Sequence, residues 1–202
     1  MIPVRVSSET RERYVRNIIS VWRAATPEQM QRGRMWYRAA NELASLITDG
    51  DARTGAGVIA ALSANKSWSE NCRLARRAYE TGALSGHLQD ALTKVAEIMA
   101  GTDPVEVLPM ERKTGMFFRC IADPSDHDAV VIDRHAHDVA VGETCGNRDR
   151  GLGSVNRYAL LADCYREAAL WLGELPSTVQ SVTWVVHTER IAGTGTRGPR
   201  RP

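Results

Sequence analysis

The sequence predicts an all-α fold. Apolar residues recur at helical spacing along about nine segments of the chain. Several of these segments open with an N-cap residue followed by proline, and none shows a convincing alternation of a half-buried strand. With 202 residues, of which 43% are hydrophobic and 25% charged, the chain can build one good core or two small helical lobes.

We therefore expect a single all-helical domain of two lobes over residues 1–191. The central lobe is expected at approximately residues 50–145, and residues 1–49 and 150–190 are expected to form the other. Residues 192–202, which combine glycine, threonine and arginine, are predicted to be a flexible basic tail. The net charge of +2 combines two basic ends with an acidic middle, which suits either phosphate contacts from the periphery or solvated helix faces.

The first half of the chain is predicted to form a series of helices that begin or end at capping signals. Thr26-Pro27-Glu28-Gln29 is the clearest, because it places an N-cap threonine, a proline at the first helical position and a capping-box glutamine together. The expected helices begin near Ser8, run from Pro27 to near Gly50, from about Asp51 to Ser63, from Ser67 to about Thr81, and from Ser85 to Ala100.

The second half is predicted to contain two short helices, starting at Lys113 and after Asp133 and separated by the polar loop 123–128. A loop rich in glycine leads to a long helix over residues 154–171. The last segment, 176–187, has valines that suit a strand, but Pro176 at its first position favours a helix.

Composition argues against several functional classes. No apolar run approaches the length that spans a bilayer and no signal peptide opens the chain, so we expect no membrane partner and a cytoplasmic location. The four cysteines are irregularly spaced, which argues against a zinc ribbon or an iron–sulfur cluster and favours buried free thiols. No cofactor is expected.

Two residues are candidates for chemistry, Lys113 and Asp133, each at the start of a predicted helix. Asp133 follows Val130-Val131-Ile132, and as an N-cap it would accept backbone hydrogen bonds that favour the carboxylate form. A purely structural cap is the alternative. For Lys113, the alternatives to catalysis are an exposed lysine or a phosphate contact.

The pattern Leu108-Pro109, Lys113-Thr114 and, some twenty residues later, Val131-Ile132-Asp133-Arg134-His135 resembles the helix-hairpin-helix DNA glycosylase superfamily of the endonuclease III type. The segment 58–65, Val-Ile-Ala-Ala-Leu-Ser-Ala-Asn, resembles the apolar helix of that family that ends in Leu-Leu-Ser-Ala-Gln. The two segments cover roughly residues 55–145. The hairpin itself departs from the family, since Met110-Glu111-Arg112 replaces glycines that let backbone N–H groups approach a DNA phosphate.

The resemblance implies a catalytic role for two residues. Asp133 matches the catalytic aspartate, which stabilises the cationic sugar as the glycosidic bond breaks. Lys113 matches the lysine with which bifunctional members attack the anomeric carbon. Such a lysine needs burial or nearby positive charge, which Arg112 and Arg134 could supply.

Further residues are expected to contact the substrate or DNA. Asn65 takes the place of the amide that wedges into the space left by an extruded base, with a turn-forming asparagine as the alternative. Trp68 could stack on a base or pack in a core. His135 is expected near the cleft. No metal site is expected, because His135 and His137 point about 200° apart on a helix.

The sequence thus predicts a DNA-base-directed enzyme that extrudes a nucleotide and acts at its glycosidic bond. The first alternative keeps the fold and changes the reaction: glycosylase-like phage proteins are associated with thymine hypermodification, the transfer of a group onto an activated hydroxymethyl base. The missing hairpin glycines resemble those proteins, so a bacteriophage origin, with action in the host cytoplasm, is expected. The second alternative is a non-catalytic DNA- or protein-binding module.

Overall fold

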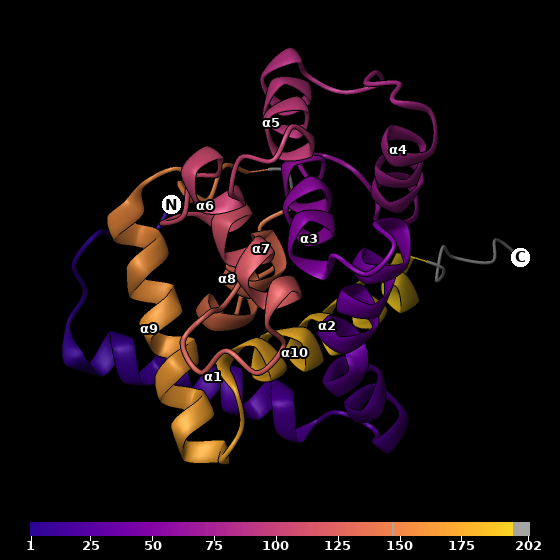
Figure 1. Cartoon of the computed structure of the whole chain (residues 1–202). Coiled ribbons are helices and arrows are strands. Elements are labelled where there is room, and N and C mark those ends of the chain that lie inside the picture. Colours follow the sequence, from indigo (N-terminus) through magenta and orange to yellow (C-terminus); the bar gives the residue numbers. More distant parts are fainter. Residues whose placement is uncertain (147, 196–202) are drawn as a thin grey trace, which may run out of the picture. The chain divides into compact units, whose positions relative to one another are not determined.

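The structure is a computed structural model that describes residues 1–146 and 148–195, and within them it is all-α, which confirms the predicted fold class. Figure 1 labels its helices, whose bounds are α1 Ser8–Arg23, α2 Pro27–Ile47, α3 Ala52–Ala61, α4 Trp68–Thr81, α5 Gln89–Met99, α6 Pro104–Val107, α7 Lys113–Ala122, α8 Arg134–Val141, α9 Val155–Leu172 and α10 Pro176–Gly195. None of these helices combines the length and the apolar character needed to cross a bilayer.

The chain folds into two compact units, which divide at residues 36/37 and 129/130. The first unit contains residues 1–36 and the described residues from Val130 onward, and the second contains residues 37–129. Helix α2 belongs to both, since its first ten residues lie in the first unit and the rest in the second.

In the first unit, helices α1, α8, α9 and α10 pack against one another, and the short α8 contacts the other three (Figure 1). Each of the three longer helices contributes apolar residues to the core: Ile18 of α1, Tyr165 of α9 and Val182 of α10 are fully buried. Asn17 of α1 donates a hydrogen bond of 2.9 Å to the carbonyl of Ala140, which attaches the end of α8 to α1. The buried faces therefore hold α8 in place although it is too short to be stable alone.

In the second unit, α3 is the central helix and contacts α4, α5, α6 and α7. Residues 55–61 of α3 are buried without exception and are mostly small, so neighbouring helices can approach closely. Gly55 shows how close: a Cβ there would lie 2.3 Å from the carbonyl oxygen of Ala44. The close packing of α3 against its neighbours therefore requires a residue without a side chain at this position.

Most predicted helix boundaries are close to the observed ones. The capping box is formed as expected: the Thr26 N–H donates to Oε1 of Gln29 at 2.9 Å, and the Gln29 N–H donates to Oγ1 of Thr26 at 3.3 Å. The helix expected from Ser85 was wrong, since α5 begins only at Gln89. The backbone over Ser85 is held instead by Arg77, whose Nη2 donates to the Ser85 carbonyl at 2.6 Å.

The C-terminal helix is longer than expected, because α10 continues to Gly195 rather than ending near His187. The helical hydrogen bonds run on through residues that carry no stop signal before Gly193. Residues 192–195 of the predicted flexible tail 192–202 are thus helical, and the rest of that tail, from residue 196 onward, lies outside the described residues.

Candidate functional site at the start of α8

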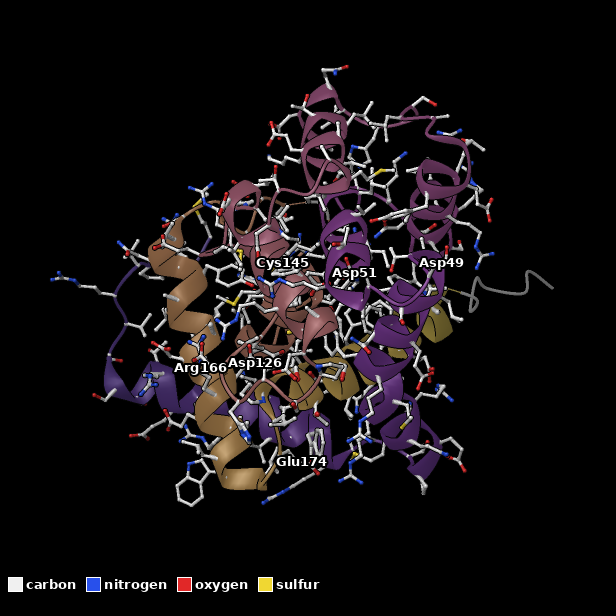
Figure 2. All side chains as sticks on the ribbon, viewed as in Figure 1. Asp49, Asp51, Asp126, Cys145, Arg166 and Glu174 are labelled. Atoms are coloured by element: carbon white, nitrogen blue, oxygen red, sulfur yellow. The ribbon has the colours of Figure 1, made fainter. Side chains whose placement is uncertain are left out.

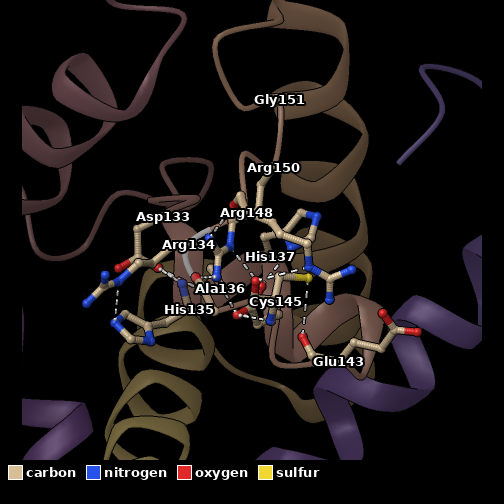
Figure 3. Close-up of polar contacts among 12 residues, drawn as sticks. Asp133, Arg134, His135, Ala136, His137, Glu143, Cys145, Arg148, Arg150 and Gly151 are labelled. Atoms are coloured by element: carbon tan, nitrogen blue, oxygen red, sulfur yellow. Dashed lines mark hydrogen bonds and ion pairs between the residues drawn. The ribbon is translucent and has the colours of Figure 1, made fainter. Parts of the chain in front are cut away.

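Asp133 is the N-cap of α8, as the sequence predicts. Its Oδ1 atom accepts two backbone hydrogen bonds, from the N–H of His135 at 3.0 Å and the N–H of Ala136 at 2.8 Å (Figure 3). Across the described residues, its second oxygen, Oδ2, has no hydrogen-bond partner, and the residue is partly exposed. The helix start thus fixes one carboxylate oxygen and leaves the other available.

The segment before Asp133 is positioned by Tyr158 of α9. Its buried hydroxyl donates to the carbonyl of Val130 at 3.0 Å and accepts from the N–H of Ile132 at 2.9 Å. These bonds satisfy a buried extended backbone that pairs with no strand in the described residues. The entry to α8, and therefore the position of Asp133, is set by a tyrosine that is 26 residues from Ile132 in the sequence.

His135 lies against α10 on one side of α8. Its ring makes edge-on contacts with Trp184, at a centroid distance of 6.1 Å, and with His187, at 5.6 Å. Its Nε2 accepts a hydrogen bond of 3.1 Å from Nε of Arg134, while its buried Nδ1 has no partner among the described residues. Burial lowers the pKa of His135, and the same cause lowers the pKa of His187, so both rings are neutral at pH 7.

His137 and Asp138 face another group of residues, in the loop that follows α8. Oδ1 of Asp138 is 3.0 Å from Nδ1 of the buried His137, and Oδ2 accepts from the N–H of Cys145 at 3.1 Å. Arg150 adds two bonds, from Nε to Oδ1 at 2.9 Å and from Nη2 to Oδ2 at 2.8 Å (Figure 3). Burial opposes ionisation of Asp138, but the hydrogen bonds from Arg150, His137 and Cys145 outweigh it and lower its pKa to about 2.

Potential ligand atoms of His137, Asp138 and Cys145 lie within 4.8 Å of one another. A cation there would have to displace the Arg150 guanidinium, which already neutralises the carboxylate with two hydrogen bonds. Burial also raises the pKa of the Cys145 thiol, which opposes the thiolate that a metal requires. The cluster is better described as an ion-pair network that attaches Cys145 and Arg150 to α8.

All four cysteines are free, but the expectation that all are buried was wrong for two of them. Cys120 and Cys164 are buried, whereas Cys72 and Cys145 are partly exposed. Cys72 lies on an outer face of α4 and Cys145 in the loop after α8, and no neighbouring helix covers either position fully.

The predicted residues of the hairpin region lie in the second unit. Arg112 is the N-cap of α7 and Lys113 its first residue; both are exposed and neither forms an ion pair among the described residues. The glycine-free turn before them is closed by a 3.1 Å hydrogen bond from the Arg112 N–H to the Pro109 carbonyl. A Cβ on Gly115 would lie 2.3 Å from Cα of Met110, so the close approach here is provided by a glycine inside α7.

Asn65 and Trp68 also lie in the second unit, where α3 ends and α4 begins. Asn65 is exposed at the tip of the turn and has a φ of 57°, a left-handed conformation that asparagine tolerates better than most residues. Trp68 is 37% exposed and packs edge-on against Phe117 of α7 at a centroid distance of 6.4 Å. Both residues therefore present side-chain surface to solvent.

The structure thus gives two groups of predicted residues, each within one unit: Asp133, Arg134 and His135 in the first, and Asn65, Trp68, Arg112 and Lys113 in the second. The sequence did not predict Trp184 and His187, which pack against His135, or Arg150 and Cys145, which contact Asp138. Asp138 directly follows His137 in the sequence, whereas Trp184, His187, Arg150 and Cys145 are brought into contact with α8 only by the fold.

The fold and this site define an all-helical protein with a capping carboxylate at the start of a buried short helix. The chain belongs to a family of unknown function, DUF7178, whose model matches residues 1–191. No curated protein matches the chain. No solved structure matches it either, so the resemblance to glycosylases is carried by the residues quoted above.

Proposed function

We propose that this protein is a DNA-base-directed enzyme of the glycosylase type, which extrudes a nucleotide and acts at its glycosidic bond with Asp133. The observation that carries the proposal is the state of this carboxylate. Oδ1 is fixed by two backbone N–H groups in the first turn of α8, and Oδ2 has no partner in the described part of the chain. A capping role alone requires only the first oxygen.

In the proposed reaction, the base departs with the electron pair of the glycosidic bond and the sugar becomes an oxocarbenium-like cation. A carboxylate held near the anomeric carbon stabilises that charge, and a water molecule then adds to the carbon and releases a proton. His135 lies two residues after Asp133, with neutral imidazole character that suits hydrogen bonding to a base.

The second unit supplies the remaining proposed contacts. Asn65 is exposed at a turn and is proposed to occupy the space of the extruded base, with Trp68 stacking beside it. Arg112 is proposed to contact phosphate, and Arg134 is the proposed phosphate contact of the first unit. Lys113 is the candidate nucleophile of a lyase form of the reaction. Its neutral amine attacks the anomeric carbon, and the base leaves with the electron pair of the glycosidic bond and takes up one amine proton. The bond from that carbon to the ring oxygen then breaks, the second amine proton passes to the ring oxygen, and an imine is left.

The test is base release from duplexes that each carry one modified or mismatched base, measured as abasic sites. Asp133→Asn is the informative variant, because asparagine caps a helix about as well as aspartate but carries no charge. Asp51→Asn is a matched control: Asp51, labelled in Figure 2, caps α3 by accepting the Thr54 N–H at 3.0 Å. We expect wild type and Asp51→Asn to release a base and Asp133→Asn to release none.

An imine formed by Lys113 would be trapped by borohydride as a covalent protein–DNA adduct that Lys113→Ala cannot form. Full activity of Asp133→Asn would contradict the proposed role of the carboxylate.

A second candidate, group transfer to a hydroxymethylated thymine, is favoured by the glycine-free turn at residues 109–112. It predicts altered nucleosides, by mass spectrometry, in DNA from cells that express the protein and no abasic sites. On either proposal the enzyme acts in the cytoplasm, that of the host if a phage encodes it.

A further inference from the structure

Helix α4 has a strongly cationic outer face that the proposed active-site residues do not include. Its three arginines line a hollow of about 300 Å³, whose complete lining is Ser69, Cys72, Arg73, Arg76, Arg77 and Glu80. These positions follow the helical repeat, so they form one stripe along α4, the helix labelled in Figure 1. We refer to Arg73, Arg76 and Arg77 as the α4 basic face.

None of these arginines forms an ion pair within the described residues, and in this they differ from four of the seven other basic residues of their unit. Four of the other basic residues between 37 and 129 are neutralised by acidic partners: Arg53 by Asp103, Lys66 by Glu70, Lys94 by Asp90, and Arg119 by Asp126 and Asp128. Arg73 and Arg76 are exposed. Their charges are therefore available to an external anion.

Arg77 is held in place rather than free to move. Its Nη2 donates to the Ser85 carbonyl at 2.6 Å and is 2.8 Å from the Ser85 hydroxyl. Its Nε is buried and has no partner in the described residues. The bonds to Ser85 therefore fix the guanidinium of an arginine that lines the hollow.

The charge of this face is local. Residues 37–129 contain thirteen acidic and ten basic residues, so the unit as a whole is acidic. The basic face lies between Trp68 at the start of α4 and Glu80 near its end, and Glu80 places a negative charge at the C-terminal limit of the hollow. The net charge of the unit would not attract anions in general. The positive charge is confined to a narrow stripe along α4, where an anion could bind.

We propose that the α4 basic face binds consecutive phosphates of a DNA strand. The inference rests on the proposed function and supplies a phosphate grip in place of the glycine-rich hairpin that this chain lacks. Arg73 and Arg76 are about 4.5 Å apart along the helix axis, a spacing from which long side chains reach neighbouring phosphates. Asn65 and Trp68, at the start of the same helix, are also exposed, so the segment combines cations with an aromatic ring, both of which bind nucleic acid.

The test is the salt dependence of binding to a fluorescent DNA duplex, measured by anisotropy at a series of KCl concentrations. Each phosphate contact contributes about 0.9 to the slope of log affinity against log salt. We expect the double variant Arg73→Ala/Arg76→Ala to lower the slope by about two. Arg73→Lys/Arg76→Lys keeps the charges and is expected to retain the slope. Arg5→Ala/Arg23→Ala is the charge-matched control, since both arginines are exposed and unpaired among the described residues.

A slope that the alanine pair leaves unchanged, or a wild-type protein that binds no duplex, overturns the inference. Circular dichroism of the alanine pair checks that the fold is retained. If the alanine double variant does not fold, Arg73→Lys/Arg76→Lys still tests the inference. That variant keeps both positive charges, so a lowered slope would also overturn the inference. Base release is measured separately on the same duplexes. A lowered slope in proteins that release no base would support the phosphate track and contradict the proposed enzymatic function, so the two failures are distinguishable.

Discussion

Arg150 and Asp138 form a two-pronged ion pair, in which Nε donates to Oδ1 at 2.9 Å and Nη2 donates to Oδ2 at 2.8 Å. Asp138 lies in α8 and Arg150 in the loop that follows it, and the Asp138 carboxylate is almost fully buried. The pair therefore fixes the loop against the helix that Asp133 caps.

This ion pair predicts loss of stability in acid. The pKa of Asp138 is lowered from 3.8 to about 2, so the folded state binds its proton less readily than the unfolded state. Its contribution, of about 2 kcal/mol, is complete above about pH 4 and is lost as the pH falls through about 2. We expect the free energy of unfolding, measured by urea denaturation from neutral to acidic pH, to depend less on pH in Asp138→Asn than in wild type. The control Asp149→Asn, an exposed carboxylate in the same loop, should behave as wild type.

The histidines around α8 predict a second, separate pH effect. Burial lowers the pKa values of His135 and His187 below the ordinary value of 6.5, so the unfolded state takes up protons first as the pH falls. Stability is therefore complete above about pH 6.5 and decreases below it. Thermal unfolding should show a smaller loss between about pH 7 and pH 5 for His187→Phe than for wild type. A variant of exposed His127, His127→Gln, should lose as much stability as wild type, and an equal loss in all three would contradict the prediction.

Removing the hydroxyl of Tyr158 should destabilise the protein. Tyr158→Phe leaves the buried carbonyl of Val130 and the N–H of Ile132 without these bonds, which costs about 1–3 kcal/mol. Tyr79→Phe is the matched control, because the buried hydroxyl of Tyr79 has no partner in the described residues. Urea denaturation should show a loss for the first variant and almost none for the second; equal losses would mean that the bridge contributes nothing.

Gly115 is predicted to be essential for the turn that precedes α7. Gly115→Ala places a Cβ 2.3 Å from Cα of Met110. Because that Cα belongs to the backbone and cannot rotate away as a side chain could, the turn itself must shift. We expect a loss of about 1–3 kcal/mol, as for other overpacked sites. Gly153→Ala, where a Cβ would meet nothing within 4 Å, is the control. Differential scanning calorimetry should show a lower melting temperature for Gly115→Ala but not for Gly153→Ala. Equal melting temperatures would mean that crowding at Met110 does not matter.

The parts of this structure that the sequence could predict are those with local causes. The N-cap of α8, the capping box at Thr26 and the start of α7 each depend on residues within a few positions of one another. The start of α5 was missed because Arg77, a residue of another helix, holds the preceding segment. The α4 basic face could have been inferred from the helical spacing of its arginines, a signal that is present in the sequence.

The surroundings of Asp133 had no such local signal. Tyr158, Trp184 and His187 are aromatic residues on amphipathic helices, and nothing in their sequence distinguishes a contact with α8 from ordinary core packing. One of the two boundaries between the units, at residues 36/37, falls inside α2, where the helix continues without a break and no linker marks the division.

The central claim, that the free oxygen of Asp133 acts on a glycosidic bond, is tested most directly by single-turnover base release with Asp133→Asn beside Asp51→Asn. We predict that the rate of Asp133→Asn falls by at least about a hundredfold, while its affinity for the duplex and its unfolding free energy stay at the wild-type level. An Asp133→Asn protein that releases base at the rate of Asp51→Asn would contradict the claim.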